Sequence, residues 1–102
     1  MDNNNNYAVT VEKDLADLIP VFMGNRRKEI ETLRQALATG DFEQLRQLGH
    51  RMRGVGNSYG FTRISEFGKQ VEDGARTGDR AAIESCIGAY SDYIAKVQIN
   101  YE

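Results

Sequence analysis

The sequence contains little of what disulfide-linked, membrane-spanning or nucleic-acid-binding proteins need. Its 102 residues include one cysteine, one proline and no tryptophan. Cys86 has no second cysteine to pair with, which favours a reducing, cytoplasmic environment. No apolar run approaches the roughly 18 residues that span a bilayer, and residues 1–6 lack the basic and apolar stretches of a secretory signal. Because the net charge is −2, we also expect no binding to nucleic acid.

The composition is that of one small globular domain. Hydrophobic residues make up 40% and charged residues 27% of the chain, as in ordinary soluble proteins. The asparagine-rich start predicts a flexible tail over residues 1–10, followed by one domain over residues 11–102. A domain of this size buries about two thirds of its unfolded surface, so we expect its chemistry on the surface.

Helix-ending glycines divide the chain into segments of helical length. Each is followed by a polar residue that can cap the next helix. Pro20 fits a first helical turn and predicts a short leading helix over about residues 11–19. Residues 7–11 alternate as a strand would, but this stretch is too short to predict one. The glycine and cap pairs are Gly40 with Asp41, Gly60 with Thr62, and Gly78 with Asp79.

The apolar residues between these breaks follow the helical period. Four amphipathic helices with short connections predict an all-α fold, an antiparallel up-down four-helix bundle with a short extra amino-terminal helix. The apolar stripes are Ile19, Phe22, Met23, Ile30, Leu33 and Leu37; Leu45, Leu48, Met52, Val55 and Tyr59; Ile64, Phe67 and Val71; and Ile83, Ile87, Tyr90, Ile94, Val97 and Tyr101.

His50 is the one histidine, and it lies on the polar side of its predicted helix. At about 100° per residue it points away from the apolar stripe. A glycine inside a helix costs about 0.5–1 kcal/mol relative to alanine, yet Gly49, Gly54 and Gly56 surround this histidine. Gly54, one turn later, leaves bare backbone over which a partner's active site can close. Arg53 supplies forked donors suited to phosphate oxygens.

These features favour phosphoryl transfer. On position alone, the alternatives are that His50 is an ordinary surface histidine and that Arg53 is an ordinary solvated charge. The segment from His50 to Gly54 resembles the His-x-x-Lys-Gly signature of the histidine-containing phosphotransfer (HPt) domain family. Arg53 stands where the family commonly has lysine. Gly49 stands where alanine usually precedes the histidine, which we expect to loosen the helix locally. Further family-like positions are Leu33, Ala36, Leu37, Gly40, Asp41, Leu45, Leu48, Gly60, Ile64, Val71 and Glu72.

The resemblance implies a monomeric phosphoryl carrier rather than an enzyme. The group passes from a phospho-aspartyl receiver domain of a response regulator, or from a kinase such as a hybrid sensor histidine kinase, to Nε2 of His50 and on to another receiver. Arg53 then stabilises the phosphoryl charge, and Gly54 permits close approach. The resemblance places Mg²⁺ on the receiver. This chain is expected to hold no metal or cofactor and, without a glycine-rich nucleotide loop, to have no autokinase activity.

In a hairpin that closes at residues 40–41, the first long helix lies beside His50. We therefore expect a receiver to contact Arg27, Lys28, Glu31, Gln47, Arg51 and Asn57. Arg27 and Lys28 would attract the acidic rim of the receiver. The alternative is that these two side chains are merely solvated.

Two other interpretations of function stay open, and one residue has two possible roles. A noncatalytic helical adaptor would bind signalling partners without phosphotransfer. A metal-binding bundle would need an inward Glu-x-x-His pair, where this chain has Gln47. Arg26 falls within an apolar stripe, either because its stem packs while its head reaches water or because it contacts a docking partner.

Overall fold

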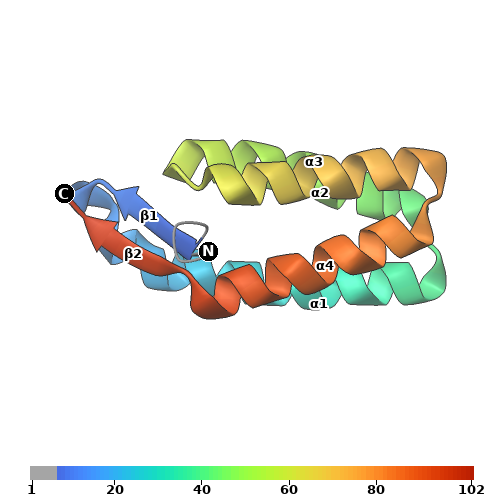
Figure 1. The fold of residues 1–102 in the computed structure, drawn as a ribbon, viewed down its shortest axis with the longest axis horizontal. Coiled ribbons are helices and arrows are strands. Elements are labelled where there is room, and N and C mark those ends of the chain that lie inside the picture. Colours follow the sequence, from blue (N-terminus) through green and yellow to red (C-terminus); the bar gives the residue numbers. More distant parts are fainter. Residues whose placement is uncertain (1–6) are drawn as a thin grey trace, which may run out of the picture.

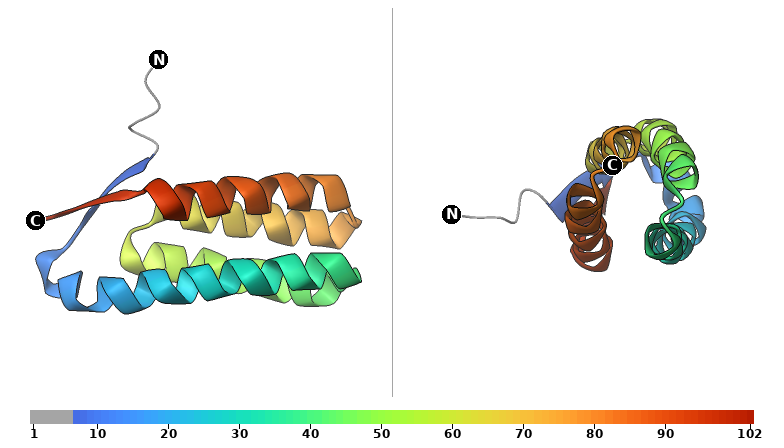
Figure 2. Two further views of the ribbon diagram at one scale, coloured as in Figure 1. Left: turned by 90° about the horizontal axis from the view of Figure 1, so that it is seen from below. Right: turned by 90° about the vertical axis from the view of Figure 1, so that its right-hand side faces the viewer.

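The computed structural model describes residues 7–102, and four long helices dominate this part of the chain (Figure 1). They are α1 (Ile19–Thr39), α2 (Phe42–Tyr59), α3 (Thr62–Thr77) and α4 (Arg80–Lys96). The turns after α1 and α3 lie at one end of the molecule, and the turn after α2 lies at the other. Seen along their axes, the helices follow one another in chain order (Figure 2), and α1 also contacts α4. The prediction of a mainly helical fold built on four helices is confirmed.

Glycine ends each of the first three helices, as the sequence predicts. Gly40, Gly60 and Gly78 have φ angles of 71°, 82° and 69°, a conformation that side chains with a Cβ atom seldom adopt. These left-handed residues reverse the chain within one or two residues. Each helix can therefore lie directly beside the next.

Aspartates begin two of the helices. The side chains of Asp41 and Asp79 accept hydrogen bonds from the backbone three residues later, at 3.0 and 3.1 Å, which satisfies amides that the helix leaves free. The prediction for Thr62 is wrong. Phe61 occupies the N-cap position of α3, and its buried phenyl ring has no acceptor for a capping hydrogen bond.

The amino-terminal helix expected over about residues 11–19 is not confirmed in that form, because only residues 13–18 are helical and they form a 3-10 helix. Strand β1 (Ala8–Val11) pairs in parallel with β2 (Gln98–Tyr101), and a short 3-10 helix, η2 (Lys13–Leu18), leads into α1. The chain after α4 is therefore a strand rather than a continuation of the last helix. Of the predicted tail, residues 8–10 belong to β1, whereas residues 1–6 lie outside the described part of the chain.

The apolar stripes meet in one core. Nearly all predicted stripe residues are buried, while Val55, Tyr59 and Val97 are half-buried and Tyr101 is exposed in β2. At about 25 cal/mol per Å² of apolar surface removed from water, this burial is the main force that stabilises the bundle. The core spans all four helices and includes Val11 of β1.

Arg26 belongs to a polar cluster inside the bundle. Its side chain is 10% exposed, its Nε lies 3.1 Å from Oε1 of Glu29, and its guanidinium lies 4.7 Å from the ring centre of Phe22. Tyr90 of α4 donates a hydrogen bond of 2.7 Å to the same oxygen of Glu29. Burial raises the pKa of Glu29 above its ordinary value. The Arg26 stem thus packs, as one of the two interpretations expects, but its head pairs with Glu29 inside the bundle instead of reaching water. The cluster joins α1 to α4.

Helices α2 and α3 make the most extensive contact in the bundle. A Cβ atom at Gly49 would lie 2.7 Å from the backbone nitrogen of Glu72, and one at Gly68 would lie 2.8 Å from the backbone nitrogen of Arg53. Side chains at these two positions would force the helices apart. The glycines therefore allow the backbones to touch next to His50.

Candidate functional site

His50 lies on the outer surface of α2, as the helical period predicts. Its side chain is 72% exposed, and its Nδ1 atom lies 3.5 Å from Oε2 of Glu72 on α3. This distance is slightly longer than an ordinary N–H···O hydrogen bond of about 2.7–3.2 Å. One edge of the ring thus faces a carboxylate. Nε2, on the other edge, faces away from it.

Glu72 is the buried centre of the site. Its side chain is only 2% exposed and accepts hydrogen bonds from Arg53 Nη1 at 2.8 Å and from Arg76 Nη2 at 2.9 Å. The hydrogen bond from Arg53 outweighs desolvation, and together with the Arg76 charge it lowers the pKa of Glu72 below its usual range. Glu72 is therefore a carboxylate that two cations hold in its charged form.

The sequence interpretation assigned no role to Glu72 or Arg76. Two signals were available. Glu72 lies directly after Val71 of the buried stripe and one turn after Gly68, so the helical period places it against α2. Arg76 follows Glu72 by four residues, the spacing of a helical ion pair. Neither signal identifies His50 as the neighbour, because that contact depends on how α2 and α3 pack.

The three glycines around His50 have different roles. A Cβ atom at Gly54 would meet nothing within 4 Å, whereas one at Gly56 would lie 2.6 Å from the backbone nitrogen of Ser65. The space that a Cβ atom at Gly49 would need is likewise occupied by the backbone of α3. Gly54 thus provides the open backbone that the sequence predicts beside His50. Gly49 and Gly56 serve the packing of α2 on α3, which the expected loosening at Gly49 did not anticipate.

The residues expected to contact a receiver are all exposed, and four of them line two different hollows. Lys28 and Arg51 line the same hollow of about 300 Å³ between α1 and α2. Arg27 and Glu31 line a different hollow, between α1 and α4. Gln47 and Asn57 lie on α2, where Gln47 donates a hydrogen bond of 3.0 Å to Glu43.

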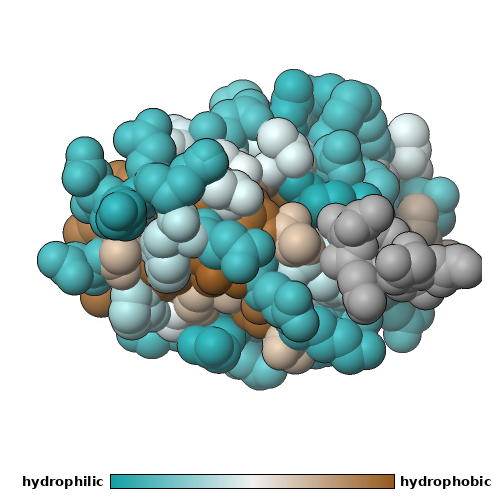
Figure 3. Space-filling view, turned by 60° about the vertical axis from the view of Figure 1, so that its left-hand side comes forward, coloured by the Kyte–Doolittle hydropathy of each residue, from teal (hydrophilic) through white to brown (hydrophobic). Residues whose placement is uncertain are grey.

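An apolar hollow continues the same α1–α2 seam. It measures about 290 Å³, includes Leu18, Val21, Val55 and Tyr59, and shares Arg26 with the neighbouring hollow. Leu18 and Val21 are 48% and 66% exposed. Another face of the molecule, seen with the end that carries the strands forward, also shows hydrophobic residues among hydrophilic ones (Figure 3). Leu18 and Val21 were not among the residues expected to contact a partner.

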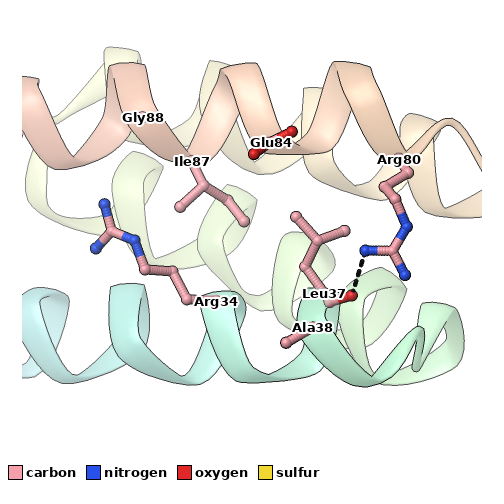
Figure 4. A pocket seen from close by; sticks show the side chains of 7 residues that line it. All are labelled: Arg34, Leu37, Ala38, Arg80, Glu84, Ile87 and Gly88. Carbon is pink, nitrogen blue, oxygen red and sulfur yellow. Dashed lines mark hydrogen bonds between the residues drawn. The ribbon is translucent and has the colours of Figure 1, made fainter.

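A groove of about 450 Å³ lies on another side, between α1 and α4 (Figure 4). Arg34 and Arg80 stand at its two ends. Arg80 donates a hydrogen bond of 2.7 Å to the carbonyl oxygen of Leu37 and so satisfies a group at the end of α1. The groove has no residue from α2 or α3, so it is separate from the site at His50.

The geometry defines a class of protein. A surface histidine over a buried carboxylate suits a protein that carries a group rather than one that encloses a substrate. The Hpt domain family matches residues 17–99. The chain therefore belongs to this family, which confirms the resemblance seen in the sequence. No match was found among curated proteins or solved structures.

Hpt domains carry phosphoryl groups on histidine in phosphorelays, and they interact with response-regulator receiver domains and kinases. They are phosphocarrier modules rather than ATP-binding kinases. In the part of this chain that the structure describes, no helix combines the length and apolar character needed to cross a membrane.

Proposed function

We propose that His50 is the phosphoryl acceptor and donor of this Hpt domain, and that Nε2 is the reacting atom. The observation that carries the proposal is the 3.5 Å approach of Nδ1 to the buried carboxylate of Glu72, on a ring whose side chain is 72% exposed. A carboxylate beside Nδ1 favours the tautomer with its proton there. The lone pair is then on Nε2, at the open edge of the ring.

Transfer from a receiver then needs few groups from this chain. The Nε2 lone pair attacks the phosphorus of an aspartyl phosphate in line, and the bond from phosphorus to the aspartate oxygen breaks. The aspartate leaves as a carboxylate, and the ring gains positive charge. Glu72 stabilises that charge through Nδ1–H. Transfer to the next receiver reverses these changes.

Arg53 and Gly54 have supporting roles in this proposal. Arg53 lies three residues after His50 and its side chain is 44% exposed, so its guanidinium can turn from Glu72 to the transferred phosphoryl group. Gly54 offers backbone that nothing covers within 4 Å of a Cβ position. A receiver can approach the ring over this position.

The Mg²⁺ that the reaction uses belongs to the receiver in this proposal. The carboxylate nearest to His50 already accepts hydrogen bonds from two arginines, so it does not suit a Mg²⁺ ion. We further propose that the chain acts as a cytoplasmic monomer, with an antiparallel up-down bundle, and without autokinase activity, nucleic acid or membrane.

The α1–α2 seam is the proposed receiver surface. Lys28 and Arg51 form no ion pair with the described residues, whereas most other arginines and lysines in the described part of the chain do. Their free charge complements the acidic rim of a receiver. Next to them, Leu18 and Val21 offer the exposed apolar area that such an interface buries.

The test is phosphoryl exchange with receivers phosphorylated in advance. The wild-type chain should take up acid-labile phosphate while the receiver loses it, and His50→Gln should fold but take up none. A chain that binds receivers but never takes phosphate would instead be the noncatalytic adaptor.

A further inference from the structure

Glu72 is shared by two arginines that hold different oxygens. Arg53, on α2, donates to Oε1 at 2.8 Å, and Arg76, on α3, donates to Oε2 at 2.9 Å. Oε2 is also the atom that lies 3.5 Å from Nδ1 of His50. Arg76 therefore acts on the carboxylate oxygen that faces the reacting ring.

The two arginines have different neighbours. Arg53 shares the surface of α2 with His50, so it can reach a group bound to Nε2. Arg76 comes one turn after Glu72 on the same helix, and its side chain is 56% exposed. A buried carboxylate that loses its only cation is strongly destabilised. Without Arg76, Arg53 would therefore be held at Glu72.

We propose that Arg76 is a positioning residue that keeps Glu72 paired when Arg53 turns toward the phosphoryl group. This inference rests on the proposed function of His50. Arg76 neutralises part of the Glu72 charge throughout the cycle, and Arg53 is free to move. Glu72 keeps its place beside Nδ1 in both states.

Phosphoramidate is a suitable donor for the test because it needs no docking surface. Nε2 attacks the phosphorus of the zwitterionic form, whose nitrogen already carries three protons, the P–N bond breaks, and the electron pair of that bond leaves with ammonia. The proton on Nδ1 stays in place, and the positive charge of the ring faces Glu72. The rate of phosphohistidine formation then reports the site alone.

Arg76→Gln should lower this rate by about tenfold, the effect of losing one charge-assisted contact in the transition state. Arg76→Lys should recover most of it. In an Arg53→Gln background, Arg76→Gln should change the rate less than about twofold, because no Arg53 is left to release. Arg63→Gln is the matched control, since Arg63 is a half-buried arginine of α3 that pairs with Glu66.

Unfolding by urea separates this role from a structural one. Loss of both arginines should destabilise the fold by more than the sum of the single losses, because Glu72 then has no cation. A rate loss from Arg76→Gln that is equally large without Arg53, or no rate loss at all, would overturn the inference while leaving His50 as the acceptor. A wild-type chain that gains no phosphate would overturn the proposed function and, with it, this inference.

Discussion

Gly49 of α2 and Gly68 of α3 face each other with no room for a side chain between them, since a Cβ atom on Gly68 would lie 2.6 Å from the carbonyl oxygen of Gly49. His50 directly follows the first of these glycines, and Glu72 comes one turn after the second. The backbone contact thus places the buried carboxylate beside the histidine. The contact of Gly49 with Gly68 therefore determines both the packing of α2 on α3 and the position of Glu72 beside His50.

The first prediction compares two glycines on α2. Gly49→Ala should destabilise the fold by about 1–3 kcal/mol, the usual cost of overpacking, because its Cβ atom would meet backbone at 2.7 Å. Gly54→Ala should instead stabilise it by up to about 1 kcal/mol through helix propensity. Urea unfolding measures both. Equal effects of the two substitutions would show that the contact between α2 and α3 is looser than described.

A second prediction concerns access to His50. Gly54→Ala should slow transfer from a receiver, and Gly54→Leu should slow it further, because added atoms stand where the receiver approaches. Gly88→Leu is the control, since that position is equally open but lies on α4. Transfer rates are measured by rapid quench. If all three variants transferred at the wild-type rate, Gly54 would have no part in docking.

The third prediction follows from the lowered pKa of Glu72. A carboxyl group whose pKa is lower in the folded state stabilises the fold above its unfolded pKa, about 4.3, and loses that effect as the pH falls through the folded value. The stability difference between wild type and Glu72→Gln should therefore be largest near neutral pH and shrink below about pH 4.3. Urea unfolding across this range measures it.

Glu29→Gln provides the opposite case. Burial raises the pKa of Glu29, so its contribution is fully present below the unfolded pKa and is lost as the pH rises through the folded one. Glu29→Gln should gain stability relative to wild type as the pH rises. A Glu72→Gln difference that does not vary with pH would contradict the charged state assigned to Glu72.

The fourth prediction tests the α1–α2 seam. Reversal of Lys28 and Arg51 to glutamate should lower the association rate with a receiver by about tenfold or more at low ionic strength and have less effect at high salt. Arg27→Glu should have a smaller effect, because Arg27 lines the hollow beside α4. Stopped-flow measurements at two salt concentrations compare them. A larger effect from Arg27 would move the docking surface toward α4.

The helices could be predicted because their determinants are local. Apolar residues recur at the helical period, and a single glycine such as Gly40 can end a helix through its own backbone angle. The exposure of His50 follows from the same period. These features need no knowledge of which helices touch.

The features that the sequence could not predict concern contacts between distant residues. Strand β1 is stabilised by β2 at the other end of the chain, and four residues of alternating pattern cannot indicate such a partner. The same holds for Glu72, whose place beside His50 depends on the contact of Gly49 with Gly68. Arg27 and Lys28 are adjacent in sequence yet line different hollows, because neighbouring residues on a helix point about 100° apart.

The most direct test of the account is to identify the atom that carries the phosphoryl group. The chain is labelled with ¹⁵N, phosphorylated by a receiver or by phosphoramidate, and examined by NMR of the histidine ring nitrogens. We predict phosphorus bound to Nε2 of His50, a proton on Nδ1, and no label in His50→Gln. Phosphate on Nδ1, or on any other residue of the chain, would contradict the arrangement of His50 over Glu72 as the basis of transfer.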